Sequence, residues 1–431
     1  MKQEYLRAGG KRLKRSLPSA LVLGLLAVTA WADSTVLRCG TLVDVERRQL
    51  VRQQDILVAD GVIADLGSGH AEPDGATVID LGGHYCLPGL IDAHTHLMPG
   101  GSGLNSSSAE KTLIALRNAQ TMLQHGYTTL RIPGDGDIGY GSIALRDAIA
   151  SGLFTGPRMQ VAPHFLCPLG GHCDRNALAA DSGVPTAAHV IAAGEDAARE
   201  AVRRELKYGA DWIKVHATGG IMSTGDDPWV QAFTDAELAA FSDETHRHGK
   251  KITAHIHGAD AVKSAVRAGF DSVEHGTLMD DEAIEMMVES GTWLVPTVYV
   301  LDYLLESTQS RRITPEIMAK ARAVAEIRDV SFRKAYEAGV RMAVGSDQVF
   351  PHRHSAREFA ALVRQGVTPM DAIVMGTING ATLLGLEDEI GSVAVGKQAD
   401  IIAVPANPLE DISILEKVGF VMLGGRIVRN D

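Results

Sequence analysis

The stretch PGLIDAHTH, residues 88–96, places a short apolar strand directly before two histidines. On a strand, His94 and His96 point to the same side because they are two positions apart. Imidazole is a neutral ligand suited to Zn²⁺ and related ions. An isolated His-x-His pair is often a chance occurrence, so its meaning depends on the other residues of metal-binding types in the chain.

Four later apolar segments carry further residues of metal-binding types near their carboxyl ends. These segments are WIKVH at 212–216, ITAHIHG at 252–258, VEHG at 273–276 and VGSD at 344–347, and they supply Lys214, His255, His275 and Asp347. Each residue has a structural alternative: a hydrogen-bonded histidine, a helix N-cap for the aspartate, or a buried ion pair for the lysine. Together, and in this order, they predict a two-metal hydrolytic site.

The central part of the chain repeats one unit, in which a helical stretch ends in glycine and an apolar strand comes next at once. Glycine suits this joint because the residue after a helix often needs positive φ. Strands are expected to start near residues 88, 127, 158, 211, 251, 272, 292 and 340. Eight strands alternating with helices predict an α/β fold, a (β/α)8 TIM barrel over residues 88–385, with its chemistry at the carboxyl ends of the strands. The joint glycines are Gly126, Gly209, Gly249, Gly269, Gly291 and Gly339, and Thr234 to Glu237 reads as a capping box.

Both ends of the chain have short strands separated by turns. Neither residues 33–87 nor residues 386–431 could bury the face of a sheet alone. We therefore expect the two segments to pack together as one small β-sandwich domain.

Residues 1–32 have the pattern of a secretory signal peptide: a basic start, a short apolar run from 17 to 30, and Ala30-Trp31-Ala32 before the expected cleavage point. An uncleaved anchor helix is the alternative. The whole chain carries a formal net charge of −12, and this segment holds six basic residues and one acid, so the mature part carries −17. This negative charge argues against nucleic acid and anionic membranes as partners. The signal-peptide pattern predicts a periplasmic or secreted location.

The four cysteines do not have the spacing of a zinc ribbon. In an oxidising compartment Cys167 and Cys173 could bridge across a short loop. Buried thiols are an equally good interpretation, and the pairing of Cys39 with Cys86 stays open.

One motif imitates a dinucleotide site. Residues 134–139, GDGDIG, match G-x-G-x-x-G and come directly after an expected strand. Two aspartates in the loop would repel a pyrophosphate, and the chain shows no clear acidic ribose partner beyond it. We interpret the segment as a loop between a strand and a helix.

The chain resembles the amidohydrolase superfamily in its binuclear form with a carboxylated lysine. The resemblance rests on residues 88–96 and on GSVAVGKQADI at 391–401, and it covers essentially all of residues 35–431. Within the superfamily the chain is similar to the imidazolonepropionase-related group, which includes Xaa-Pro dipeptidase-like and ochratoxinase-like members.

The resemblance implies a role for each candidate residue. His94, His96 and Asp347 would hold one divalent ion, and His255 and His275 a second, with Zn²⁺ as the expected metal. Lys214, carrying a carbamate, would bridge the two ions. Hydrolysis would proceed by attack of a hydroxide that bridges the metals, with Asp347 as the proton carrier.

Four further residues are expected to contact substrate. His257 shares a strand face with His255, His164 ends the third strand, His172 lies in the long loop after it, and Tyr299 comes after the seventh strand. For His172 a structural role is equally consistent with the sequence.

The resulting expectation is a metal-dependent enzyme that cleaves the amide bond of a dipeptide or an N-acyl amino acid, ochratoxin-type amides included. The alternatives are a cyclic-amide hydrolase, a lactonase or phosphotriesterase-like enzyme, and a metal-loaded binding protein without turnover. The resemblance also implies a homo-oligomer, such as an octamer. No nucleic-acid partner and no membrane contact after signal cleavage are expected.

Overall fold

The computed structural model describes residues 34–69, 72–98, 106–137, 139–179, 181–182, 190–306 and 313–431. The expected signal peptide at 1–32 lies outside these residues. No described helix combines the length and the apolar character needed to cross a membrane.

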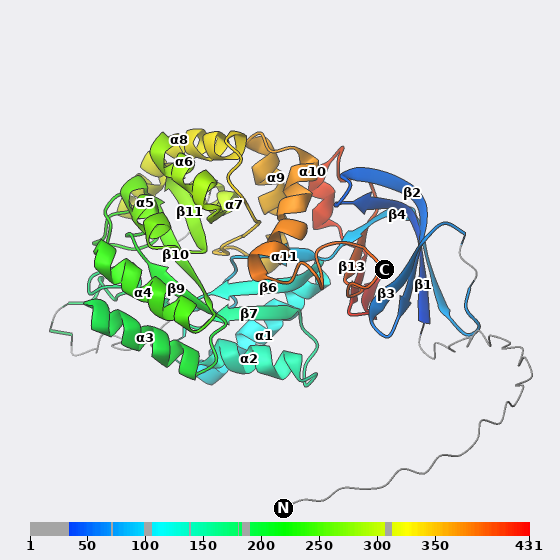
Figure 1. Cartoon of the computed structure of the whole chain (residues 1–431), viewed down its shortest axis with the longest axis horizontal. Helices are drawn as coiled ribbons and strands as arrows, with labels where there is room; N and C mark the ends of the chain where they lie inside the picture. Colours follow the sequence, from blue (N-terminus) through cyan, green and yellow to red (C-terminus); the bar gives the residue numbers. More distant parts are fainter. Residues whose placement is uncertain are drawn as a thin grey trace, which may run out of the picture.

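Strands from both ends of the chain form one mixed seven-stranded sheet in the order β15-β14-β13-β4-β1-β2-β3. In Figure 1 the first and last segments of the chain, blue and red, lie side by side. The joining of the two ends is therefore as expected. The strands are β1 (Ser34–Asp44), β2 (Gln49–Ala59), β3 (Val62–Gly67), β4 (Thr77–Pro88), β13 (Ile401–Val404), β14 (Phe420–Leu423) and β15 (Arg426–Asn430).

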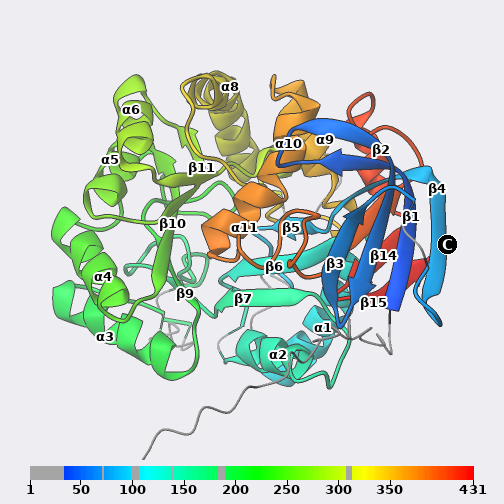
Figure 2. The same ribbon diagram turned by 45° about the vertical axis from the view of Figure 1, so that its right-hand side comes forward.

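Hydrogen bonds join all seven strands of this unit into one curved sheet, and packing of its faces as a β-sandwich stays a prediction. The edge strand β3 contacts the segment before β13: the backbone N–H of Ile63 on β3 donates to the carbonyl of Lys397, at 2.8 Å. Gly425 lies so close to the backbone of Gly61 that a Cβ would not fit. Continuous hydrogen bonding from β3 to β15 thus lets one sheet enclose its own apolar core (Figure 2). A disulfide between Cys39 and Cys86 joins β1 to β4.

The central part of the chain has parallel strands covered by helices. The strands form a five-stranded sheet, β12-β11-β10-β9-β8, and a three-stranded sheet, β5-β6-β7. Residues 341–344 connect these sheets on one side: Leu294 N donates to Arg341 O, and Ala93 N donates to Val344 O, both at 2.8 Å. This is the TIM-barrel-like α/β arrangement that the sequence predicts, while full closure of an eight-stranded ring stays a prediction. The strands are β5 (Leu90–Asp92), β6 (Tyr127–Pro133), β7 (Arg158–Ala162), β8 (Phe165–Leu166), β9 (Trp212–His216), β10 (Lys251–Gly258), β11 (Ser272–Leu278) and β12 (Trp293–Val295).

Helices lie along the outside of these strands (Figures 1 and 2). The capping box is present at α4, where Thr234 N donates to Glu237 Oε2 at 2.8 Å and Glu237 N donates to Thr234 Oγ1 at 3.3 Å. All six joint glycines have positive φ, as the repeated unit predicts. The helices are α1 (Ser108–Gln124), α2 (Gly141–Ala150), α3 (Glu195–Lys207), α4 (Asp235–Arg247), α5 (Ala259–Arg267), α6 (Asp281–Ser290), α7 (Val298–Glu306), α8 (Pro315–Glu337), α9 (Arg357–Arg364), α10 (Pro369–Met375) and α11 (Ile378–Leu384), with short 3₁₀ turns at His352–His354 and Ile412–Glu416.

Candidate functional site

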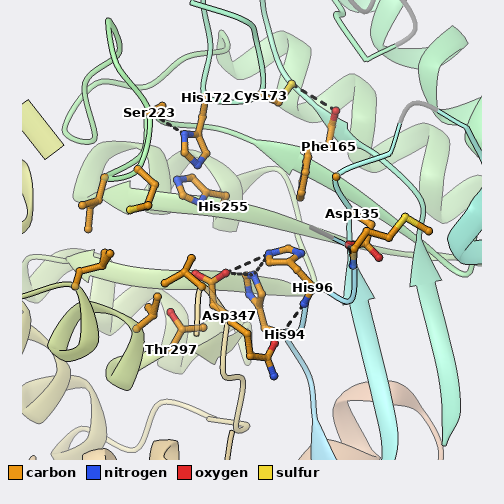
Figure 3. Close-up of a pocket in the computed structure, with 18 of the residues that line it drawn as sticks. His94, His96, Asp135, Phe165, His172, Cys173, Ser223, His255, Thr297 and Asp347 are labelled. Atoms are coloured by element: carbon orange, nitrogen blue, oxygen red, sulfur yellow. Dashed lines mark hydrogen bonds and ion pairs between the residues drawn. The ribbon is translucent and has the colours of Figure 1, made fainter. Parts of the chain in front are cut away.

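Three of the expected metal ligands meet at one point. His94 and His96 come just after β5, and Asp347 comes just after the segment 341–344. The two Nε2 atoms are 3.3 Å apart, and Asp347 Oδ1 is 3.2 Å from Nε2 of His96 and 3.7 Å from Nε2 of His94 (Figure 3). Among the described residues, His94, His96 and Asp347 therefore have their ligand atoms close enough together to hold one metal ion.

The hydrogen bonds of the two imidazoles leave the correct nitrogen free for a metal. His94 Nδ1 donates to Glu274 Oε2 at 2.6 Å, and His96 Nδ1 donates to the carbonyl of Gly134 at 2.8 Å. Since Nδ1 carries the proton in each neutral ring, the lone pair is on Nε2. Hydrogen bonds of this kind orient histidine ligands in metal sites.

Glu274 belongs to a buried polar network behind His94. Its Oε1 accepts from the guanidinium of Arg131 at 2.6 Å and from Ser272 Oγ at 2.9 Å, and the hydroxyl of Thr253 also donates to it. The side chains of Arg131 and Glu274 are both fully buried. Arg131 also lies over the Trp212 ring, 4.6 Å from its centroid. A rigid charged pair therefore fixes the orientation of the first histidine.

Lys214, on β9, lines the same cavity, and its amine is buried. The residue is 1% exposed, and among the described residues no hydrogen bond reaches Nζ. Burial lowers the pKa of Lys214 to about 8, against an opposing contribution from Glu274. A buried ion pair was the structural alternative for this residue, and no ion pair at Lys214 occurs among the described residues.

His255 on β10 and His275 on β11 lie beside the first three ligands. Their ring centroids are 4.6 Å apart, and the His275 ring is 5.1 Å from that of His94. Thr297 Oγ1 is 2.7 Å from His275 Nδ1, so the other ring nitrogen is left for a ligand. All six residues of the expected set therefore gather at the carboxyl ends of the parallel strands.

Three residues at this centre have a backbone conformation that non-glycine residues rarely adopt. The φ angles of His275, Thr297 and Asp347 are +73°, +48° and +45°. Such conformations typically cost about 1–3 kcal/mol each and occur at functional sites. The surrounding structure thus holds these side chains in place against a local preference.

Burial and neighbouring charges set the protonation state that a metal site requires. Burial lowers the pKa of His94 to about 4, and the charge of Lys214 acts in the same direction. Burial alone would raise the pKa of Asp347, but His94, His96 and His275 hold it well below its usual value. A neutral His94 and an ionised Asp347 at neutral pH are the states that bind cations.

The centre opens into a cavity of about 1420 Å³. Typical small-molecule sites measure roughly 300–1,000 Å³, so this one has room for more than a compact ring. The loops after β6, β8 and β9 and the helices α1, α7 and α8 all contribute to its lining.

Two of the expected substrate contacts do face this cavity. His257 lies on β10, with Nδ1 2.6 Å from Thr277 Oγ1, and burial lowers its pKa to about 3. His172 stacks on His255 with ring centroids 4.4 Å apart, and Ser223 Oγ is 2.6 Å from its Nδ1 (Figure 3). Both residues line the cavity.

The other two expected contacts lie elsewhere. His164 is buried with Nδ1 2.7 Å from Glu205 and Nε2 2.8 Å from the carbonyl of Gly139, and it does not line the cavity. Tyr299 is in helix α7, where its hydroxyl accepts from Arg357 at 3.0 Å. Both residues were expected at the site because each comes just after a strand. Their side chains lie elsewhere, since their polar atoms bind other parts of the fold.

His216 is a cavity residue that the sequence reasoning did not select. It is two positions after Lys214 on β9, so both side chains project from the same face of the strand. Its ring is 4.9 Å from that of His255, and its Nδ1 has no partner among the described residues. The i, i+2 spacing from Lys214 was the available signal.

A disulfide between Cys167 and Cys173 closes the loop that carries His172. Cys173 itself lines the cavity. The short bridge considered at the sequence level is therefore present and limits the freedom of this part of the wall.

The similarity of this chain to known proteins extends over nearly its whole length. A profile of the Amidohydrolase family matches residues 85–428. Ochratoxinase from Aspergillus niger is 32% identical over 436 aligned positions, which cover 94% of this chain and 88% of that protein.

Solved structures show the same likeness. A Xaa-Pro dipeptidase with bound methionine superposes with a TM-score of 0.87 at 36% identity, covering 92% of this chain and 100% of that chain. A prolidase complexed with N-methylphosphonate-L-proline has a TM-score of 0.84 at 28% identity, with the same coverage. The resemblance drawn from residues 88–96 and 391–401 is confirmed. The chain belongs to the amidohydrolase family and is a hydrolase.

Proposed function

We propose that this hydrolase cleaves the amide bond of a dipeptide or an N-acyl amino acid with a free carboxylate, aromatic acyl amides of the ochratoxin type included. The similarity to an ochratoxinase and to Xaa-Pro dipeptidase structures supports this substrate class. The volume of the cavity, about 1420 Å³, suits an open chain with two side groups.

The single observation that carries the proposal is the amine of Lys214. A buried polar atom without a partner costs free energy, so native proteins rarely keep one without a ligand. Among the described residues, Nζ of Lys214 is such an atom, and it lines the cavity together with the four histidines and the aspartate of the expected ligand set. Addition of carbon dioxide to the neutral amine, with loss of a proton, would convert it into a carbamate, whose oxygens are suited to binding cations.

The residues divide the chemistry among them. Two divalent ions held by His94, His96, Asp347, His255, His275 and the modified Lys214, with Zn²⁺ as the expected metal, would supply hydroxide near neutral pH and polarise the amide carbonyl. Asp347 accepts the proton of the attacking water and delivers it to the leaving amine. Glu274 and the carbonyl of Gly134 keep the imidazoles in the tautomer that binds. His257 and His172 orient the substrate from the cavity wall.

The test combines metal analysis with a substrate panel. Purified protein should contain about two divalent ions per chain, and it should release amine from N-acyl amino acids and dipeptides. Asp347→Asn should retain at least the ion held by His255 and His275. Its turnover should fall by about 10³-fold or more, because the proton carrier is lost. Protein without stoichiometric metal, or with no turnover on any amide, would overturn the proposal.

Three other interpretations make different predictions once cyclic amides and esters are added to the panel. A cyclic-amide hydrolase would open imidazolones or hydantoins faster than it cleaves linear amides, and a lactonase or phosphotriesterase-like enzyme would prefer esters. A metal-loaded binding protein would show the ions without turnover on any of these. The roomy cavity favours the linear amides.

We also propose that the protein is exported after removal of residues 1–32 and acts as a homo-oligomer. The two disulfides support an oxidising compartment. Sequencing of the mature N-terminus after cell fractionation, and light scattering of the purified protein, test these two points.

A further inference from the structure

The loop after β6 contains a carboxylate that has no part in the proposed hydrolysis. Asp135 belongs to the motif at residues 134–139 that imitates a dinucleotide site, and it lines the cavity. The residue is 2% exposed, and Oδ1 accepts the backbone N–H of Met98 at 2.9 Å. Among the described residues, Oδ2 is buried and has no hydrogen-bond partner.

The neighbouring charged groups have partners of their own. The carboxylate of Asp137 accepts from Ser108 Oγ at 2.5 Å and from Gly141 N at 3.3 Å. The amine of Lys111 donates to the carbonyl of Gly136 at 2.6 Å. Within the described ranges, no ion pair connects Asp135 to a lysine or an arginine. Among the described residues of this loop, Asp135 is thus the buried acid whose second carboxylate oxygen lacks a hydrogen-bond partner.

Its position relative to the metal ligands is fixed by the backbone. Gly134, the residue before it, accepts the hydrogen bond of His96 Nδ1 at 2.8 Å. Figure 3 shows Asp135 beside His96, on the side away from Asp347. The Phe165 ring, 5.5 Å from that of His96, closes the wall next to this loop. Gly134 has a φ of +96°, and a Cβ there would collide with the Phe165 ring.

We propose that Asp135 binds the free α-ammonium group of the N-terminal residue of a dipeptide. The inference rests on the proposed function and narrows it: the natural substrates are dipeptides with a free amino terminus, and N-acyl amino acids are poorer. In a dipeptide the α-nitrogen is two bonds from the carbonyl carbon that is attacked, so the ammonium must stand beside the metal ligands. A buried carboxylate needs a cation or a donor, and an ammonium supplies both.

The experiment compares two substrates that differ only in this ammonium. Leucyl-phenylalanine carries it, and 4-methylpentanoyl-phenylalanine has hydrogen in its place, with the same acyl skeleton and the same product, phenylalanine. The metal-loaded wild-type enzyme should prefer the dipeptide by about 10²-fold in kcat/KM, the range expected for a desolvated charge pair. Asp135→Asn keeps the acceptor for Met98 N but removes the charge, so the preference should fall to about tenfold or less.

The matched control is Asp137→Asn, two positions further along the same loop. Its carboxylate is engaged with Ser108 and Gly141, so the ratio of the two kcat/KM values should stay as in the wild type. A preference for the acyl substrate in the wild type would overturn the inference while leaving amide hydrolysis intact. An equal loss on both substrates in Asp135→Asn would also overturn it, because Asp135 would then act only by holding the loop.

A binding measurement separates this inference from the proposed function. In metal-loaded Asp347→Asn protein, calorimetry should show leucyl-phenylalanine binding at least about tenfold more tightly than 4-methylpentanoyl-phenylalanine. Adding Asp135→Asn should abolish that difference. Equal binding of the two compounds would overturn the role of Asp135 irrespective of turnover. A clear difference in binding with no turnover in the wild type would support the ammonium site and overturn the proposed hydrolysis.

Discussion

Replacing Glu274 by Gln gives the sharpest test of how the fold holds His94, the first of the proposed metal ligands. Both side chains of the Glu274–Arg131 pair are fully buried, and their closest N–O distance is 2.6 Å. Removing one partner leaves the charge of Arg131 in the interior, which costs about 3–5 kcal/mol. The hydrogen bond to His94 Nδ1 weakens as well, but its contribution is not additive because the same carboxylate makes both contacts.

Two quantities should change together in Glu274→Gln. The free energy of unfolding of the metal-free protein, from urea titration, should fall by about 3–5 kcal/mol. The affinity for the divalent ion, from competition with a chelator, should fall by about 10- to 100-fold because the His94 ring loses its charged orienting partner.

Thr253→Val is the matched control at the same carboxylate. Its hydroxyl is one of several donors to Glu274, so its removal should cost only about 1 kcal/mol and leave metal affinity nearly unchanged. The double variant with Arg131→Met should recover part of the stability lost in Glu274→Gln, since no unpaired charge is left. If Glu274→Gln loses less than about 1 kcal/mol and keeps its metal affinity, the argument from the buried pair is refuted.

Three further changes have expected outcomes. Replacing Lys214 by Met should raise the free energy of unfolding of the metal-free protein by about 1–2 kcal/mol, since a buried amine without a partner is removed, yet abolish activity in a hydrolysis assay. Breaking the bridge with Cys167→Ser plus Cys173→Ser should lower stability by about 2 kcal/mol and raise KM more than it lowers kcat, because the loop that holds His172 gains freedom. Burial raises the pKa of Glu358 from 4.5 to about 8, so its contribution is fully present below pH 4.5 and is lost as the pH rises through 8. Urea titrations should therefore show the stability of the wild type relative to Glu358→Gln falling across that pH window, and a flat difference would contradict the raised pKa.

The strands and the meeting of the six candidate residues could be predicted well from the sequence because both depend on local spacing. The apolar runs that begin near residues 127, 158, 211, 251 and 272 became strands, since a short apolar run that comes directly after a helix-ending glycine leaves few other arrangements. Parallel strands in such a fold place their carboxyl ends at one face. Residues of suitable type at those ends therefore converge, whatever their separation in sequence.

The parts that were missed depend on partners that lie far away in sequence. His164 comes just after a strand like the ligands do, but Glu205 on α3 binds its ring, and no local pattern announces that contact. Glu274 was adjacent to a ligand and was overlooked, since its role requires Arg131 on another strand. The contact between β3 and the segment at Lys397 was not predicted either, because strand content alone does not reveal which strands become neighbours.

The buried polar atoms without partners argue for what the cavity binds. Lys214 Nζ, His216 Nδ1 and Asp135 Oδ2 all belong to residues that line the same space, although they come from a strand and a separate loop. Elsewhere in the same wall, His94, His96 and His275 each use Nδ1 within the protein. Among the described residues, Ser34 Oγ, His84 Nδ1 and the Tyr127 hydroxyl are also buried without a partner and lie outside this cavity. The three cavity atoms differ from these because they line a space that a ligand can enter, so their partners can come from outside the chain. Under the two proposals these atoms receive different partners: Lys214, as a carbamate, would bind cations, and Asp135 would bind a positively charged group of the substrate.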